Sequence, residues 1–181
     1  TQRLTVISIL LIEGLLIMRC AFIFPGQGSQ AVGMGKDLAN IYSEARCVFE
    51  EVDEALNQNL SKIIFDGPNE DLTLTENAQP ALLAVSMALV RVLERVVGFD
   101  IAGGCICVAG HSLGEYSALT ATQTFDVPNA ARILRVRGEA MQNAVPIGKG
   151  AMAALIGVDL NVAEVVASEA AAGEVCVVAN D

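Results

Sequence analysis

Charged side chains are scarce in this sequence, tryptophan is absent, and histidine occurs once. Charged residues make up 18% of the 181 residues and hydrophobic residues 53%, which is the composition of a globular chain and excludes a disordered one. Positive charge is the scarcer sign, with 11 Lys and Arg against 21 Asp and Glu and a net charge of -10. Nucleic-acid phosphates need clustered basic side chains, so we expect no nucleic-acid partner.

Cysteine spacing offers no support for a zinc site or a disulfide framework. The cysteines are five, an odd number, and no pair has the C-x-x-C spacing: Cys20, Cys47, Cys105, Cys107 and Cys176. We expect small buried thiols in a reducing, cytoplasmic protein, and neither a metal nor a bound organic cofactor.

No hydrophobic run is long enough to span a membrane. The segment 4–17 is apolar apart from Ser8, Glu13 and Gly14, and it is shorter than the roughly 20 residues that a spanning helix needs. No small-residue cleavage site follows it, so a signal peptide is not indicated either. Because Met18 stands directly before a strand-like run, we interpret residues 1–17 as an extension outside the working fold.

Short apolar runs alternate with helical patterns along the chain, which predicts an α/β fold around a mainly parallel sheet. Strands are expected at 20–24 and 106–109, and helices at 43–56, 80–97, 113–124 and 128–143. Beyond residue 148 the pattern predicts a strand at 151–158, a helix at 161–172 and a strand at 175–178. We therefore predict one unit over 18–148 and the start of a second over 149–181.

A serine stands between two glycines in the run Gly110-His111-Ser112-Leu113-Gly114, between a predicted strand and a predicted helix. This order is typical of a nucleophile elbow, in which glycines let the backbones pass and the serine hydroxyl is exposed. The N-terminus of the following helix would direct N–H groups at an oxyanion formed beside Ser112. The pattern predicts that Ser112 is an acyl-accepting nucleophile.

The base that would activate Ser112 is not evident. Histidine is the usual base, and the one histidine, His111, adjoins the serine on a tight turn that directs its side chain elsewhere. We interpret His111 as a packing or turn residue.

Arg137 lies on the predicted core face of its helix. At about 100° per residue from Ala130, Arg137 falls at about 340°, inside an apolar arc. That arc contains Ile133, Leu134, Ala140, Met141 and Ala144, while the opposite, solvated side contains Arg132, Arg135, Glu139 and Gln142. A buried guanidinium needs an anion, and two partners remain open: an internal Asp or Glu, or a substrate carboxylate.

The segment 26–30 is a glycine-containing loop after the first predicted strand, and it lacks the spacings of phosphate-binding loops. Ligands of open α/β sheets bind at the carboxyl ends of strands, so this loop and Ser112 are expected at one crevice. We hypothesise an oxyanion hole formed by the backbone N–H groups of Gln27 and Leu113.

Together these segments resemble the bacterial malonyl-CoA:acyl carrier protein transacylases, in the same order and from Met18 to the end. The matching segments are Phe24-Pro25-Gly26-Gln27-Gly28-Ser29-Gln30, Gln79-Pro80-Ala81-Leu82, Ala109-Gly110-His111-Ser112-Leu113-Gly114-Glu115-Tyr116, Arg137-Gly138 with Met141-Gln142, and Gly150-Ala151-Met152-Ala153.

The resemblance implies a larger α/β-hydrolase-like subdomain and a smaller ferredoxin-like one that begins near Ala151. It implies ping-pong transfer of malonyl from malonyl-CoA to Ser112, and then to the phosphopantetheine thiol of acyl carrier protein, for fatty-acid synthesis. Arg137 would bind the malonyl carboxylate, and the amides of Gln27 and Leu113 would form the oxyanion hole.

The resembling proteins continue for more than a hundred residues beyond the stretch matched by 178–181, and the resemblance implies that the catalytic histidine lies in that continuation. We therefore expect a C-terminally truncated chain with a partly built small subdomain. Two other functions stay open: a serine hydrolase that uses the same elbow, and a non-catalytic remnant that binds coenzyme A or carrier protein. The sequence does not indicate an oligomeric state.

Overall fold

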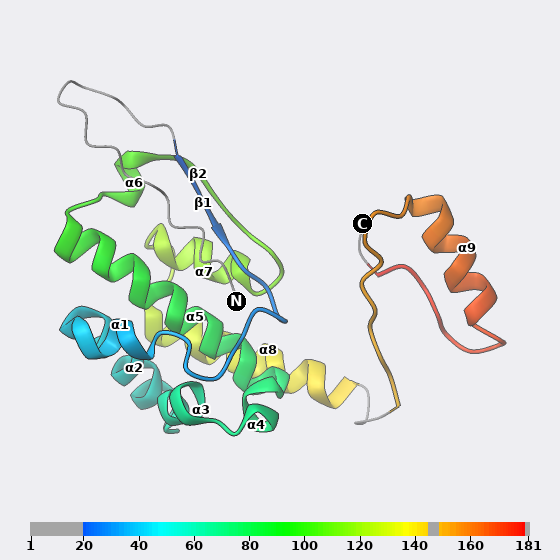
Figure 1. Ribbon diagram of the computed structural model, residues 1–181, viewed down its shortest axis with the longest axis horizontal. Coiled ribbons are helices and arrows are strands. Elements are labelled where there is room, and N and C mark those ends of the chain that lie inside the picture. The colour runs from blue at the N-terminus through cyan, green and yellow to red at the C-terminus, as the bar shows by residue number, and fades with distance from the viewer. Residues whose placement is uncertain (1–19, 145–148, 180–181) are drawn as a thin grey trace. The chain divides into compact units, whose positions relative to one another are not determined.

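The computed structural model describes residues 20–144 and 149–179, in two compact units that divide between Ala144 and Val145 (Figure 1). The elements of the first unit are β1 (Cys20–Phe24), α1 (Lys36–Ile41), α2 (Ser43–Leu56), α3 (Leu60–Asp66), α4 (Asn69–Thr73), α5 (Thr75–Val92), the π-helical turn η1 (Leu93–Val97), α6 (Ile101–Gly104), β2 (Cys105–Gly110), α7 (Gly114–Ala121) and α8 (Val127–Ala144). The second unit contains α9 (Leu160–Ala170).

The two strands of the first unit pair in parallel, with Phe24 opposite Gly110 at their carboxyl ends. This pairing confirms the predicted α/β class and the parallel sheet. Side chains alternate along β1: Phe24 is buried in the core, whereas the preceding Ile23 is 78% exposed. The strands thus have one covered face, and both carry their following loops to the same edge of the sheet.

The expectation of buried thiols is wrong for three of the five cysteines. Cys47, Cys107 and Cys176 are exposed, and Cys20 and Cys105 are half-buried. Cys107 follows the exposed Ile106 on β2, where the strand has little cover. Burial raises the pKa of the Cys105 thiol, and Cys20, Cys107 and Asp100 nearby raise it further.

The core of the first unit lies where α5 packs against α8 and α2. The buried face of α8 comprises Val127, Ala130, Ala131, Leu134 and Gly138. This face is centred some 60–90° from the predicted apolar arc on the helical wheel. Ile133 and Met141, which the arc placed in the core, are 38% and 44% exposed. The small residues on α8 face α5 because they allow the closest approach of the two helices.

Helix α5 begins at Thr75, five residues before the predicted start at Pro80. Proline lacks an N–H and favours a first helical turn, which is why the sequence pattern pointed to a start there. Here Pro80 lies inside the helix, and the preceding turn is held by burial of Asn77 and Gln79. Packing of that turn into the core therefore outweighs the local preference of proline.

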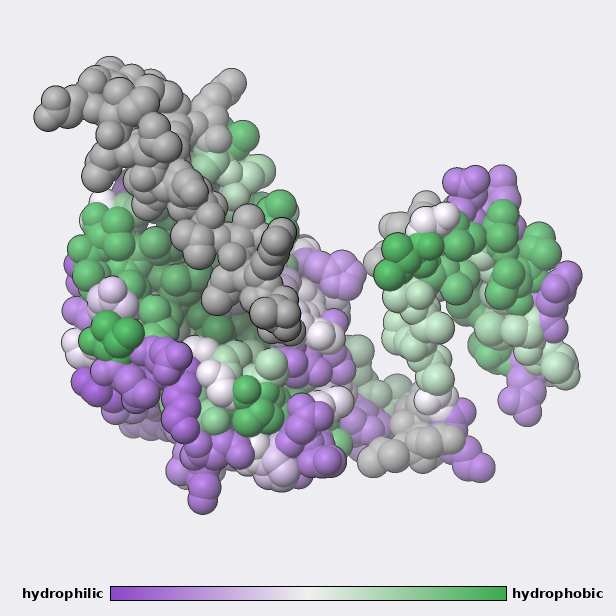
Figure 2. Space-filling view, viewed as in Figure 1, coloured by the Kyte–Doolittle hydropathy of each residue, from purple (hydrophilic) through white to green (hydrophobic). Residues whose placement is uncertain are grey.

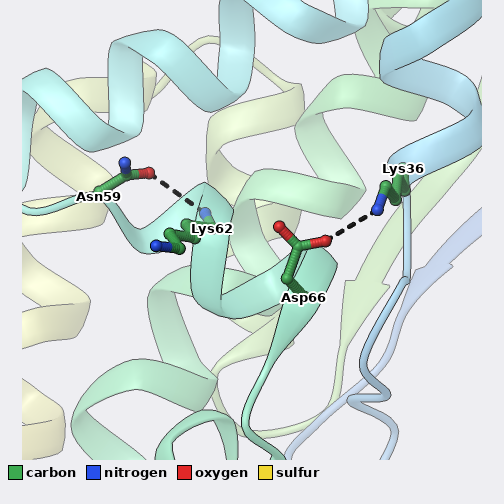
Figure 3. Close-up of polar contacts among 4 residues, drawn as sticks. All are labelled: Lys36, Asn59, Lys62 and Asp66. Atoms are coloured by element: carbon green, nitrogen blue, oxygen red, sulfur yellow. Dashed lines mark hydrogen bonds and ion pairs between the residues drawn. The ribbon is translucent and has the colours of Figure 1, made fainter.

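Short polar contacts organise the α1–α3 corner of the unit (Figure 3). The Asn59 side chain caps α3 by accepting a hydrogen bond of 3.2 Å from the Lys62 backbone N–H. The Lys36 ammonium pairs with the Asp66 carboxylate at 2.8 Å and so joins α1 to the end of α3. Both side chains are about half exposed, and such pairs contribute at most about 1 kcal/mol.

The second unit differs from its prediction. Helix α9 matches the expected helix at 161–172, but within the described residues 149–179 no strand forms at 151–158 or 175–178. A strand needs a neighbour for its backbone hydrogen bonds, and none pairs with these segments there. The unit has a largely hydrophobic visible surface (Figure 2), to which α9 contributes Val162, Val165 and Val166. Over residues 20–144 and 149–179, the structure contains no helix that is both long and apolar enough to cross a bilayer.

We predict that Leu134→Ala lowers the free energy of unfolding by about 2–5 kcal/mol, because Leu134 is fully buried and truncation leaves a cavity between α8 and α5. The adjacent Ile133 is the matched control: its partial exposure gives an expected loss under about 1 kcal/mol on Ile133→Ala. Urea denaturation of both variants measures the difference. Equal losses would contradict the observed orientation of α8.

Candidate active site

The elbow around Ser112 has the tight geometry that its sequence predicts. Strand β2 ends at Gly110 and α7 begins at Gly114. A methyl group at Gly110 would lie 1.9 Å from the carbonyl carbon of Gly114, and one at Gly114 would lie 2.4 Å from the carbonyl oxygen of Phe24. Only glycine fits either place. Ser112 itself has φ +54, a region that non-glycine residues rarely adopt, and it is exposed.

The loop after β1 lies beside this elbow, as predicted from the carboxyl ends of the strands. The His111 N–H donates to the Phe24 carbonyl at 3.1 Å. The His111 imidazole lies against Gly26, where an added methyl group would come within 2.2 Å of Nδ1. The single histidine of the chain thus packs on the loop, in agreement with its interpretation as a turn residue.

Arg137 reaches the serine from α8. Its Nη2 donates to the Ser112 hydroxyl oxygen at 3.0 Å, and its Nη1 donates to Gln79 Oε1 at 2.6 Å. The guanidinium carbon lies 5.9 Å from the centre of the Tyr116 ring, within the range of a cation–π contact. Neither of the two ion pairs among the described residues includes Arg137. The structure therefore brings Arg137 to Ser112 without an ion pair to any carboxylate of the described residues.

A chain of side-chain hydrogen bonds continues from Arg137 to the loop after β1. Gln79 Nε2 donates to Thr75 Oγ1 at 3.0 Å, and Thr75 Oγ1 donates to Gln27 Oε1 at 2.9 Å. No sequence pattern indicated Thr75 as a site residue, and Gln79 was part of a matching segment only. Their spacing of four residues places both on one side of a helix, but Pro80 moved the predicted helix start past them.

Two backbone N–H groups, beside Ser112 and in the loop after β1, have no hydrogen-bond partner among the described residues. Among the hydrogen bonds within the described ranges, none uses the N–H of Gln27 or of Leu113. Leu113 immediately precedes α7, whose N-terminal end adds a partial positive charge. These donors are the ones hypothesised as the oxyanion hole.

Arg135 was placed on the solvated side of α8, and this is wrong. Its Nη1 donates to Asn77 Oδ1 at 2.9 Å, and its Nη2 donates to Gln58. Burial lowers the pKa of Arg135, while the carboxylates of Glu76 and Glu139 oppose the shift. An arginine stays charged near neutrality in spite of this. Arg135 therefore ties α8 to α5 and to the end of α2, one turn away from the site.

Gly138 sets the distance between α8 and the first turn of α5. A methyl group at this position would lie 2.6 Å from Glu76 Cα and 2.8 Å from the Thr75 carbonyl oxygen. The close approach brings the adjacent Arg137 within reach of Gln79 and Ser112. No cluster of three or more potential metal ligands occurs in the part of the chain that the structure describes.

Residues 21–179 match the acyl transferase domain family. The chain belongs to this family. This chain is 51% identical over 141 residues to the malonyl CoA-acyl carrier protein transacylase of Bacillus subtilis, covering 78% of this chain and 43% of that protein. This finding confirms the resemblance drawn from the sequence.

Solved structures show the same likeness. The acyl-carrier-protein-S-malonyltransferase of Bartonella henselae has a TM-score of 0.85 and 56% identity, over 91% of this chain and 52% of that one. A malonyl-transacylase solved with its type II polyketide synthase acyl-carrier protein has a TM-score of 0.78 and 41% identity, over 86% of this chain and 49% of that one. This chain thus spans about half the length of these relatives.

We predict that Gly138→Ala destabilises the chain by about 1–3 kcal/mol, since the added methyl group overpacks the contact with Glu76. Helix propensity alone predicts the opposite sign, a gain of about 0.8–1 kcal/mol. Urea denaturation decides between them, with Glu139→Ala on the exposed neighbour as the control. A stabilised Gly138→Ala variant would show that α8 does not need this close approach.

Proposed function

We propose that this chain carries the acyl-accepting serine of a malonyl-CoA:acyl carrier protein transacylase of fatty-acid synthesis. The observation that supports it most directly is the 3.0 Å hydrogen bond from Arg137 Nη2 to the Ser112 hydroxyl, on an elbow whose glycines leave the serine exposed. A nucleophile in contact with a carboxylate-binding group suits an acyl group that itself carries a carboxylate.

In the proposed first step, Ser112 Oγ attacks the thioester carbonyl of malonyl-CoA. The serine proton passes to a base, and the tetrahedral oxyanion accepts hydrogen bonds from the N–H groups of Gln27 and Leu113. Collapse breaks the carbon–sulfur bond, and the protonated coenzyme A thiol leaves. The phosphopantetheine thiol of acyl carrier protein then attacks the malonyl ester, which releases Ser112 and forms the new thioester.

Arg137 has the donors for this role. A guanidinium carries five N–H groups, and one on each Nη is engaged, by Gln79 and by Ser112. The remaining donors are available to a malonate carboxylate, which guanidinium groups bind with a planar, bidentate geometry. The same guanidinium donates to Ser112 and therefore stabilises a developing alkoxide, but it does not accept the proton.

No histidine among the described residues is placed to act as the general base for Ser112. His111 packs on Gly26, and Arg137 has no acceptor. In this proposal the base belongs to the part of the transacylase fold beyond the stretch matched here. The proposed organisation is an α/β-hydrolase-like subdomain at 18–148 and a ferredoxin-like one from 149, in a cytoplasmic enzyme without a bound organic cofactor.

A serine hydrolase would use the same elbow, but the contact of Arg137 with the serine favours an anionic acyl group over a neutral ester. A non-catalytic remnant is favoured by one observation, namely that the single histidine does not serve Ser112. The two experiments below separate these functions.

We predict that incubation of the purified chain with malonyl-CoA adds one malonyl group to Ser112, detected as a mass increase on the peptide that contains this residue. We expect this ester to form even without the histidine base, because Arg137 stabilises the developing alkoxide of Ser112 and the N–H donors of Gln27 and Leu113 are unengaged. Ser112→Ala is the control and stays unmodified. An unmodified wild-type chain, together with modification of a chain extended to the length of its relatives, would favour the remnant function.

We predict that Arg137→Ala loses malonyl transfer by about 100-fold or more and gains transfer of acetyl, since a charged contact is removed and the space is left for a neutral acyl group. Ester formation with malonyl-CoA and acetyl-CoA, measured side by side by mass spectrometry, checks this. Arg132→Ala, on the exposed side of α8, is the matched control. An unchanged acyl preference would contradict the role of Arg137.

A further inference from the structure

We propose that Thr75 is a positioning residue that couples Arg137 to the oxyanion loop through Gln79 and Gln27. The inference rests on the proposed function and extends it to a residue that touches neither Ser112 nor any acyl group in that mechanism. Thr75 is the first residue of α5, and its hydroxyl lies midway in the hydrogen-bonded chain between the two parts of the site.

The chain of hydrogen bonds is continuous from the nucleophile to the loop. Arg137 donates to Ser112 at 3.0 Å and to Gln79 at 2.6 Å, Gln79 donates to Thr75 at 3.0 Å, and Thr75 donates to Gln27 at 2.9 Å. These residues come from the elbow, α8, α5 and the loop after β1. Thr75 is therefore the residue through which α5 connects Arg137 of α8 to the loop after β1.

The direction of every bond in this chain follows from Arg137. A guanidinium only donates, so Gln79 must present its oxygen to it and its NH₂ group to Thr75. The Thr75 oxygen then accepts, and its one proton is directed at the carbonyl oxygen of Gln27. The hydrogen bonds that begin at Arg137 thereby extend in one consistent direction to a side chain on the oxyanion loop.

Burial makes this order costly to break. Gln79 is fully buried and Thr75 is 9% exposed, so water cannot readily replace either partner. A buried amide left without its partner costs about 1–3 kcal/mol. The close approach of Gly138 to the Thr75 carbonyl also holds the first turn of α5 in place. In contrast, Gln27 is exposed, and its side chain is joined to the core by the hydrogen bond from Thr75.

The hydrogen bonds of Thr75 should matter most for an acyl group that the site binds at both ends, its carboxylate and its thioester oxygen. Malonyl places its carboxylate at Arg137 and its thioester oxygen at the Gln27 N–H, and the two groups must lie at the separation of one acyl unit. Thr75 maintains this separation, whereas acetyl uses only the oxyanion end. Loss of the Thr75 hydroxyl should therefore lower malonyl transfer more than acetyl transfer, and kcat more than the apparent KM, since Arg137 itself remains.

The first experiment tests the hydrogen bonds without catalysis. In ¹⁵N-labelled chain we expect the side-chain NH₂ signals of Gln79 to shift on Thr75→Val, which keeps the shape of threonine but removes the hydroxyl, and to stay near wild type on Thr75→Ser. Addition of sodium malonate should shift the Gln27 backbone amide in wild type and Thr75→Ser but not in Thr75→Val. If the side-chain NH₂ shifts of Gln79 are unchanged in Thr75→Val, the proposal is overturned.

The second experiment measures acyl preference. We expect Thr75→Val to lower the rate of malonyl-ester formation by about tenfold and that of acetyl by less than about twofold, with recovery in Thr75→Ser. Gln27→Ala, an exposed change that keeps the backbone N–H, should give the same selective loss. In the Arg137→Ala background, Thr75→Val should have no further effect on acetyl transfer. Equal losses for both acyl groups, or no recovery with serine, would overturn the proposal.

The two proposals fail in different ways. If wild type forms no malonyl ester and malonate does not shift its Gln27 amide signal, the proposed function fails. The Gln79 side-chain signals in Thr75→Val then still decide whether the Thr75 hydroxyl orients the chain of hydrogen bonds. If wild type transfers malonyl and Thr75→Val does so equally well, the function stands and the role of Thr75 is refuted.

Discussion

The site depends on the close approach of α8 to the first turn of α5. Gly138 permits this approach, because any side chain there would meet the backbone of Thr75 and Glu76. Arg135 reinforces it by donating to Asn77 and Gln58. With the two helices at this distance, the residue before Gly138 reaches both a buried amide on α5 and the serine hydroxyl on the elbow. Helix packing and the electrostatics of the site thus share one structural cause.

The elbow depends on a second close approach, between the backbones of β2, α7 and the end of β1. Gly110 and Gly114 leave no room for a side chain, and Ser112 adopts a positive φ in consequence. Parallel pairing of the strands then brings the loop of Gln27 to the same edge as the serine. The strain at Ser112 is compensated by the packing of the surrounding backbone, a common arrangement for exposed nucleophiles.

Local sequence patterns predicted much of the fold and of the candidate site. Apolar runs and flanking glycines predicted both strands, α2 and the elbow, because those features arise from short-range geometry. The family came instead from the resemblance of the matching segments. The relation between α8 and α5 was harder to predict. The apolar arc predicted for α8 placed Ile133 in the core, whereas the helix buries a neighbouring face that includes its small residues. For α5, Pro80 suggested a helix start that excluded the turn containing Thr75. Strands at 151–158 and 175–178 were wrong in this structure because a strand requires a partner that periodicity alone does not supply.

The proposed function places opposite demands on Arg137, and its hydrogen bond to Gln79 reconciles them. A guanidinium that binds a substrate carboxylate must have donors to spare, yet a half-buried cation without hydrogen bonds would be unstable. Gln79 meets the second demand as a neutral acceptor, and so it holds the guanidinium without neutralising its charge. An Asp or Glu at that place would satisfy the cation fully and compete with an incoming carboxylate. Partnering by an amide keeps the site rigid and still attractive to an anionic acyl group, next to the hydroxyl that would accept it.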